Sequence, residues 1–226
     1  MRLKDYDTRK GKRVWLSEKE IQLLIENVDE NHVEAEIAIK LMARSGLRRK
    51  EVTGDDDRHG VRFVDLVDSD IGDVVRVWHG KGDKYREPPA PQGLRNQART
   101  YRQAMGRDPD EAIVQSSDST LYDWVERARG RCWNQTNDEG WQYVGPHDLR
   151  RSWGVRLLES GVLPSVVMEF GGWEDWQTFR DHYLAEFSPE ALRRERSKIP
   201  WLGEGRQTEE NRQSYAAIQG NESHRY

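Results

Sequence analysis

Hydrophobic periodicity divides this chain into helical segments on both sides of one β-forming stretch, residues 61–88. Glycines punctuate that stretch, at Gly72 and from Gly80 to Gly82. Its β-forming residues are Val61, Phe63, Val74, Val75, Val77 and Trp78. We therefore expect two or three short antiparallel strands here, with Lys81 on a tight turn between the last two.

The segments outside this stretch carry apolar residues at helical spacing. Ser17 and Glu20 form a capping box that opens the first expected helix. The segment 33–45 is apolar on several sides, so we expect it to be buried. Further helices are expected at about 92–104, 119–131, 148–160, 164–170, 175–183 and 188–197.

These patterns predict the α+β fold class: a mainly helical domain with a small antiparallel three-stranded sheet. Residues 1–13 are basic and polar without apolar periodicity, which predicts an N-terminal arm or an unstructured start. Residues 14–198 form the expected domain. Residues 199–226 are polar and lose the pattern, which predicts a mobile tail.

Composition limits the class of protein. Of the 226 residues, 35% are hydrophobic and 34% are charged, and no apolar run approaches the roughly 20 residues of a membrane helix. The one cysteine, Cys132, excludes an intramolecular disulfide. We expect a soluble cytoplasmic protein with no membrane contact, and the acid-rich, lysine-poor composition is typical of salt-adapted proteins. The net charge of -4 argues against a generic nucleic-acid binder, although the arginines cluster apart from the acids.

One helix start carries a candidate anion site. His147 and Arg150 are three residues apart, at the beginning of an apolar-periodic segment. This spacing puts the imidazole and the guanidinium on one face of a helix, where both donate hydrogen bonds to one small anion. Such a pair is common and most often structural, so its significance depends on the other motifs of the chain.

Four further segments occur in a definite order around this pair. Upstream are Ser45 to Val52, which reads SGLRRKEV, and Gly80 to Arg86, which reads GKGDKYR. Downstream are Gly171-Gly172-Trp173 and, ten residues after the tryptophan, Tyr183. In this order they resemble the boxes of the tyrosine recombinase (phage integrase) family over about residues 15–190. A tryptophan at 173 stands where most members have a histidine.

The resemblance implies an enzyme that breaks and rejoins DNA through a 3′-phosphotyrosine intermediate. The implied catalytic residues are Arg48, Lys81, His147, Arg150, Trp173 and Tyr183. The two arginines would hold the phosphate, with further hydrogen bonds from His147 and Trp173. Lys81 would protonate the leaving 5′ oxygen, and Tyr183 would be the nucleophile. This chemistry needs no metal ion, no ATP and no other cofactor.

The resemblance also implies partners. Double-stranded DNA is the expected substrate, with contacts from Lys84, Arg86 and Arg151. Family members usually carry an N-terminal helical domain that closes a clamp around DNA, whereas this chain begins almost directly at the catalytic domain. We therefore expect weak DNA binding by the single chain, a homotetramer on DNA, and help from an accessory DNA-binding protein.

Each motif also has a structural alternative. Arg48 could cap a helix or pair with Glu51, and Lys81 and Lys84 could be solvated turn charges. Trp173 could be a core residue. Tyr183 could complete an apolar helical stripe with Trp176 and Phe179. At the level of function, a non-catalytic DNA-binding regulator on the same scaffold and a type IB topoisomerase-like enzyme remain as alternatives.

Overall fold

The computed structural model describes residues 1–6, 10–30, 32–80, 84–180, 183 and 187–199. The chain divides into two compact units, Met1–Glu186 and Phe187–Tyr226. The second unit contributes α9 (Pro189–Ser197), whose N-cap Ser188 accepts a hydrogen bond from the amide of Ala191. The domain expected over 14–198 spans this division, and only Ile199 of the expected tail is described. Within the described part of the chain, none of the helices combines the length and apolarity needed to cross a membrane.

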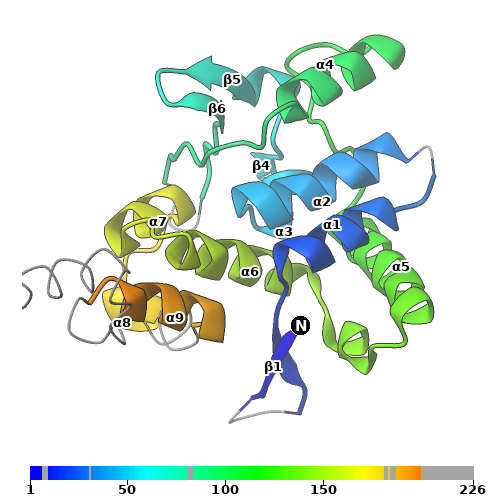
Figure 1. Ribbon diagram of the computed structural model, residues 1–226. Helices are drawn as coiled ribbons and strands as arrows, with labels where there is room; N and C mark the ends of the chain where they lie inside the picture. Colours follow the sequence, from blue (N-terminus) through cyan, green and yellow to red (C-terminus); the bar gives the residue numbers. More distant parts are fainter. Residues whose placement is uncertain (7–9, 31, 81–83, 181–182, 184–186, 200–226) are drawn as a thin grey trace, which may run out of the picture. The chain divides into compact units, whose positions relative to one another are not determined.

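Helix α2 (Val33–Ser45) forms the buried centre of the first unit (Figure 1). Its burial on several sides confirms the prediction for this segment. Five helices pack against it: α1 (Glu18–Glu26), α3 (Arg49–Thr53), α4 (Leu94–Ala104), α5 (Asp118–Thr136) and α6 (Pro146–Glu159). The chain continues from α6 into α7 (Pro164–Gly171) and α8 (Trp176–Phe179). Two short 3-10 turns, Phe63–Asp65 and Glu139–Tyr143, complete the helical elements described here.

The β-forming stretch folds into a small antiparallel sheet. Strand β5 (Leu66–Ser69) pairs with β6 (Gly72–Val75), with Leu66 opposite Val75 and Ser69 opposite Gly72. A third segment runs beside them, because the amide of Val77 donates to the carbonyl of Arg86 (2.9 Å) and that of Val75 donates to Pro88 (2.9 Å). Pro88 and Pro89 lack amide hydrogens, so this third segment does not form a continuous strand.

Residues 1–6 and 10–15 are more structured than the sequence predicts. Strand β1 (Arg2–Asp5) pairs with β2 (Lys12–Trp15) as an antiparallel hairpin. The amide of Val14 donates to the carboxylate of Asp148 (3.3 Å), and that of Leu16 donates to the Ser152 hydroxyl (2.8 Å). These contacts attach the hairpin to α6, far away in sequence, which is why local periodicity did not reveal it.

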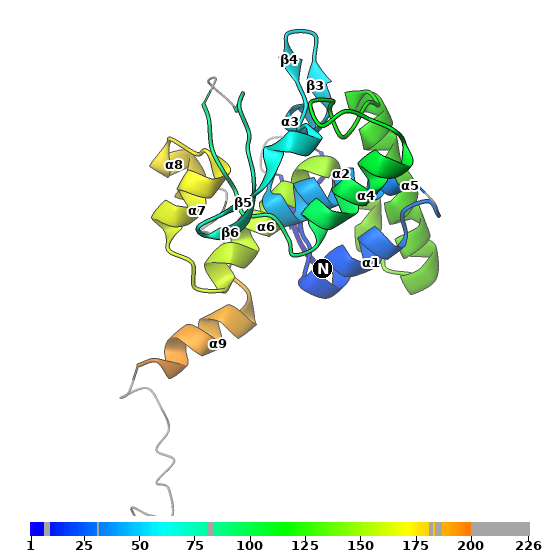
Figure 2. The ribbon, with the colours of Figure 1, turned by 90° about the horizontal axis from the view of Figure 1, so that it is seen from above.

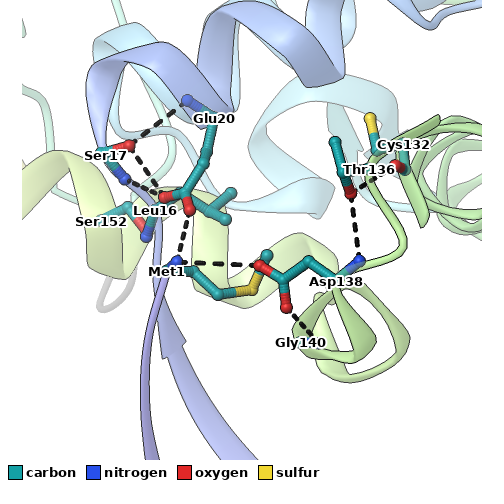
Figure 3. Close-up of polar contacts among 9 residues, drawn as sticks. All are labelled: Met1, Leu16, Ser17, Glu20, Cys132, Thr136, Asp138, Gly140 and Ser152. Atoms are coloured by element: carbon teal, nitrogen blue, oxygen red, sulfur yellow. Dashed lines mark hydrogen bonds and ion pairs between the residues drawn. The ribbon is translucent and has the colours of Figure 1, made fainter.

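Figure 3 shows how the beginning of β1 is held. The Ser17–Glu20 capping box is present as predicted, with the Ser17 amide donating to Glu20 (2.8 Å). The Met1 amino group pairs with the same Glu20 carboxylate, and Asp138 lies 3.9 Å away. A Cβ at Gly140 would lie 2.6 Å from the Met1 sulfur, so the methionine side chain packs directly on that glycine.

A second hairpin follows α3 and was not predicted. Strands β3 (Gly54–Asp55) and β4 (Arg58–His59) pair in an antiparallel register. Gly54 has φ +79°, and a Cβ there would lie 2.6 Å from the carbonyl oxygen of Arg58. Glycine is therefore required at the base of this hairpin.

Candidate active site

Arg48 stands at the beginning of α3, immediately after the left-handed turn that ends α2. Gly46 has φ +70°, and a Cβ there would lie 2.2 Å from the Trp153 ring, so the turn needs glycine. The Arg48 amide donates to Glu51 (2.7 Å), and its guanidinium donates to the other oxygen of the same carboxylate (2.7 Å). The pairing that sequence analysis kept as an alternative is present. The Arg48 side chain nevertheless remains 27% exposed and lines a pocket, so an anion can reach it.

The first turn of α6 presents His147 and Arg150. Pro146 begins the helix, where its missing amide hydrogen costs nothing. His147 is exposed, whereas Arg150 is only 1% exposed. Arg150 donates to the carbonyls of Gly46 and Gly171 (2.6 Å to the latter) and so ties the end of α2 to the end of α7.

Trp173 covers the guanidinium of Arg150. The Arg150 Cζ lies 4.4 Å from the centre of the Trp173 ring, within the range of a cation–π contact. Burial and the charge of Arg48 lower the pKa of Arg150 to about 9, while Tyr183 and Glu51 act in the opposite direction. Arg150 is therefore still a cation at neutral pH, held in place by both carbonyls and the indole.

Glu51 lies at the centre of a cluster of arginines. Arg86 makes a two-point contact with its carboxylate (2.9 and 2.7 Å) and also donates to the carbonyl of Phe170 (3.1 Å). Burial alone would raise the pKa of Glu51, but the hydrogen bonds and charge of Arg86, with the charges of Arg150 and Arg48, lower it to about 2. Glu51 is therefore ionised, and it offsets part of the positive charge around it.

Three of the predicted site residues line one pocket. Arg48, His147 and Arg150 meet at a pocket of about 300 Å³, together with Arg49, Lys50 and Asp118. Two arginines and an imidazole that converge from distant parts of the chain form a preorganised set of donors for a tetrahedral anion. Among the described side chains, no group of three or more His, Cys, Asp or Glu residues is arranged to hold a metal ion.

Tyr183 is buried in an aromatic cluster beside this site. Its ring packs against Trp173 (4.5 Å between centroids) and is stacked on Phe179 (5.2 Å). A Cβ at Gly154 would lie 2.8 Å from the Tyr183 ring, so α6 accommodates the tyrosine only because it has glycine there. The tyrosine is 4% exposed and is not among the residues lining the pocket.

Burial raises the pKa of the Tyr183 phenol. The charges of Arg150, Arg151 and Arg48, and a hydrogen bond with Arg150, oppose this shift only in part. The phenol is therefore protonated at neutral pH, and it lies within the field of the same arginines that surround the pocket. The apolar stripe with Phe179 that sequence analysis kept as an alternative is present, together with this electrostatic link.

The residues predicted to contact DNA are in different environments. Lys84 is exposed and pairs with Glu174. Arg86 and Arg151 are each 5% exposed: Arg86 is held by Glu51, and Arg151 pairs with Asp148. These two arginines therefore connect parts of the fold in this structure. Lys81 lies outside the described residues.

The role of Arg86 and the surroundings of Glu51 were missed by sequence reasoning. Arg86 is five residues after Lys81 in a basic, glycine-rich segment, which indicated a solvent-facing position. The pairing of Arg86 with Val77 across the sheet directs its side chain toward α3. Its position opposite the apolar Val77 across a hairpin was the one signal that could have placed it inside.

Comparison with known proteins fits this arrangement. The sequence profile of the phage integrase family matches residues 14–189. The chain belongs to the phage integrase family. Tyrosine recombinase XerA of Pyrococcus furiosus is 25% identical over 157 residues, which are 70% of this chain and 52% of that protein. The chain thus spans about half the length of this curated relative.

Solved structures of the phage integrase type share the fold. A crystal structure of XerA recombinase superposes with a TM-score of 0.61 and 20% identity, over 83% of this chain and 65% of that one. The XerH recombinase in its post-cleavage complex with palindromic difH has a TM-score of 0.59 and 18% identity, over 84% and 53%. These matches confirm the predicted class, mainly helical with small antiparallel sheets.

Proposed function

We propose that this member of the phage integrase family is a site-specific DNA recombinase or integrase that acts through a 3′-phosphotyrosine intermediate. The observation that carries the proposal is the convergence of Arg48, His147 and Arg150 on one pocket beside a buried tyrosine. Family membership supports the same chemistry. The proposed substrate is double-stranded DNA, bound by a homotetramer with an accessory DNA-binding protein adding affinity.

In the proposed reaction the scissile phosphate occupies the pocket. The phenolic oxygen of Tyr183 attacks phosphorus and releases its proton to water, a Tyr–O–P bond forms, and the bond from phosphorus to the 5′ oxygen breaks. Arg48 and Arg150 stabilise the charge that develops on the non-bridging oxygens. Lys81 gives the 5′ oxygen its proton. The phosphotyrosine retains the bond energy for rejoining, so neither ATP nor a metal ion is required.

The buried state of Tyr183 sets a condition on this reaction. Its ring packs against Trp173 and Phe179 and is 4% exposed. The phenol must therefore turn toward the pocket before it can reach a phosphate. The residues that follow Tyr183 directly lie outside the described part of the chain.

A covalent-trapping experiment with randomised DNA tests the function and identifies the target sequence at the same time. The protein is incubated with a library of nicked duplexes randomised around the nick, and DNA that stays attached in SDS is recovered and sequenced. We expect a covalent adduct with an enriched sequence. Tyr183→Phe should remove the adduct and keep the fold, whereas Tyr122→Phe, on the exposed side of α5, should keep both.

The other outcomes of this experiment point to the alternatives. DNA recovered only without SDS would indicate a non-catalytic binder. Adducts without sequence preference, together with relaxation of supercoiled plasmid, would indicate a topoisomerase-like enzyme. An adduct that persists in Tyr183→Phe would overturn the assignment of the nucleophile.

The role of Lys81 can be tested with a sulfur-substituted substrate. Replacing the bridging 5′ oxygen by sulfur creates a leaving group that needs no proton. Lys81→Ala should then cleave the normal substrate poorly and the thio substrate well, whereas Arg150→Ala should not be rescued. Rescue of Lys84→Ala in place of Lys81→Ala would transfer the role to Lys84.

A further inference from the structure

A second pocket adjoins the candidate active site on the other side of Arg48. It has a volume of about 160 Å³, and both Arg48 and Lys50 line it as well as the first pocket. It lies between the β3–β4 hairpin and the segment that follows β6. Figure 2 shows this hairpin projecting from the same side of the fold as that segment. A group bound in one pocket is thus next to a group bound in the other.

Three aromatic side chains line this second pocket: His59, Trp78 and His79. The rings of His59 and His79 meet edge to face, with centroids 5.5 Å apart, and Trp78 is part of the same lining. The histidine contact joins the hairpin to the sheet segment. Two parts of the chain that are 20 residues apart therefore contribute rings to one surface.

Trp78 is held firmly although its ring is 42% exposed. Its indole N–H donates to the buried carboxylate of Asp65 (2.7 Å), which Arg62 also binds (3.1 Å). Tyr85 packs behind it, with ring centroids 4.9 Å apart. The polar edge of the indole is therefore satisfied inside the fold, and an apolar face is left open to solvent.

Cationic side chains line the pocket beside these aromatic rings. Lys50, Arg58 and Arg76 line the same pocket. Its three acids already have partners: Glu51 is held by Arg86, Asp65 by Arg62, and Asp55 lies 3.8 Å from Lys50. Of the cations, Arg76 also pairs with Glu87. Together with Arg48, four cations and three acids line the pocket, so the net charge of its lining is positive. The pocket therefore combines an exposed aromatic ring with donors for phosphate.

The hairpin that carries His59 is positioned by close backbone packing. A Cβ at Gly60 would lie 2.3 Å from the carbonyl oxygen of Val52, which lies in α3 just before the hairpin. The backbone therefore passes directly over the end of α3, and no other residue fits at position 60. This packing makes the second pocket a built feature of the fold.

We propose that the second pocket binds one unstacked nucleobase of the DNA strand whose phosphate is held by Arg48. A cavity of about 150 Å³ holds a benzene-sized ring, so this open pocket of about 160 Å³ has room for one six-membered ring of a base. Aromatic side chains bind exposed bases by stacking, and nearby cations hold the adjoining phosphates. Because the two pockets share Arg48, a phosphate in the first pocket would place the base of an adjoining nucleotide at the second pocket.

This inference rests on the proposed function and gives the pocket a role in it. Strand exchange requires the bases beside a break to leave one partner strand and pair with another. Pulling a base out of an intact duplex is unfavourable, and the cost is least for a base that is already unpaired. The pocket should therefore select DNA with an unpaired nucleotide next to the bound phosphate.

Binding to three duplexes tests the inference. Tyr183→Phe protein, which cannot form the proposed covalent link, is titrated into a paired duplex, the same duplex with one unpaired adenosine, and a third with an abasic nucleotide at that position. We expect the unpaired adenosine to bind about 5- to 150-fold more tightly than the other two, the range that base stacking supplies. The abasic duplex separates base recognition from DNA flexibility.

Variants of Trp78 test whether the preference for the unpaired adenosine comes from the second pocket. In the same Tyr183→Phe background, Trp78→Ala should reduce the affinity for the unpaired adenosine to that for the abasic duplex. Trp78→Phe, which keeps a ring but loses the bond to Asp65, should retain a preference. Trp133→Ala removes a comparably exposed indole on α5, and the preference should be unchanged.

The outcomes separate the two proposals. Equal affinity for all three duplexes would overturn the base pocket and leave the proposed function standing. No binding to any duplex would also overturn the base pocket, whereas covalent trapping decides the proposed function separately. If Trp78→Ala fails to fold, Trp78→Phe decides: its smaller ring should lower the preference for the adenosine duplex over the abasic duplex, and an unchanged preference would overturn the role of Trp78.

Discussion

Arg86 and Glu51 form a buried two-point ion pair. The two terminal guanidinium nitrogens of Arg86 lie 2.9 and 2.7 Å from the carboxylate oxygens of Glu51, and each side chain is 4% exposed. The pair connects the sheet segment to α3, and Arg86 extends the link to α7 through the carbonyl of Phe170. Glu51 also binds Arg48. Arg48, which lines the pocket, is thus positioned through Glu51 by Arg86, which does not line the pocket.

Replacing Arg86 should therefore cost far more stability than replacing a surface arginine. Arg86→Met leaves a buried carboxylate without its main partner, and breaking such a pair typically costs about 3–5 kcal/mol. Arg193→Met, which removes an exposed pair with Glu190, should change the free energy of unfolding by less than about 1 kcal/mol. Denaturant unfolding measures both. Equal losses in the free energy of unfolding would contradict the role of Arg86 as the buried partner of Glu51.

The stability contributed by Glu51 should disappear in acid. Its pKa in the folded protein is about 2, below the ordinary 4.5, so the contribution is complete above pH 4.5 and is lost as pH falls from 4.5 toward 2. When complete, this contribution to the free energy of unfolding is roughly 3 kcal/mol.

Comparing wild type with Glu51→Gln tests this pH dependence. The difference in free energy of unfolding should be constant near neutral pH and should begin to narrow below pH 4.5. Asp57→Asn, between β3 and β4, controls for the loss of one negative charge at an exposed turn. A difference that does not change with pH would mean that Glu51 is not held as a carboxylate by the arginines.

Gly154→Ala should disturb Tyr183. The added Cβ would lie 2.8 Å from two atoms of the tyrosine ring, and such overpacking typically costs about 1–3 kcal/mol. Gly130→Ala is the matched control, because a Cβ there meets nothing within 4 Å on α5 and should stabilise the helix by up to about 1 kcal/mol. The melting temperature, measured by thermal unfolding, should fall in the first variant only. An unchanged melting temperature in Gly154→Ala would show that the packing of Tyr183 on α6 does not contribute to stability.

Arg48→Lys and Arg150→Lys should differ in stability although both slow cleavage. Loss of a forked donor from a preorganised site typically reduces the rate about 10²- to 10³-fold. Arg150→Lys also leaves the buried carbonyls of Gly46 and Gly171 short of a donor, at about 1–3 kcal/mol each. Arg48 is 27% exposed, so its variant should remain almost as stable as wild type. Wild-type cleavage rates in both variants would refute the phosphate clamp.

Local sequence patterns were sufficient for much of the helical fold. The Ser17–Glu20 capping box and the apolar residues on several sides of 33–45 each predicted an element that the structure contains. These signals work because helix starts, helix ends and amphipathic faces depend on residues within a turn or two. The order of the motifs likewise indicated the family before any contact was known.

Long-range contacts decided the rest. The N-terminal hairpin depends on Asp148 and Ser152 of α6, and the burial of Arg86 depends on Glu51, 35 residues earlier. A charged side chain carries no local mark of whether its partner is water or a buried carboxylate, because that depends on which elements pack around it. The sequence by itself determined most of the helices, though not α3, and the set of candidate residues. Only the tertiary structure decided which arginines face the pocket and which hold it together.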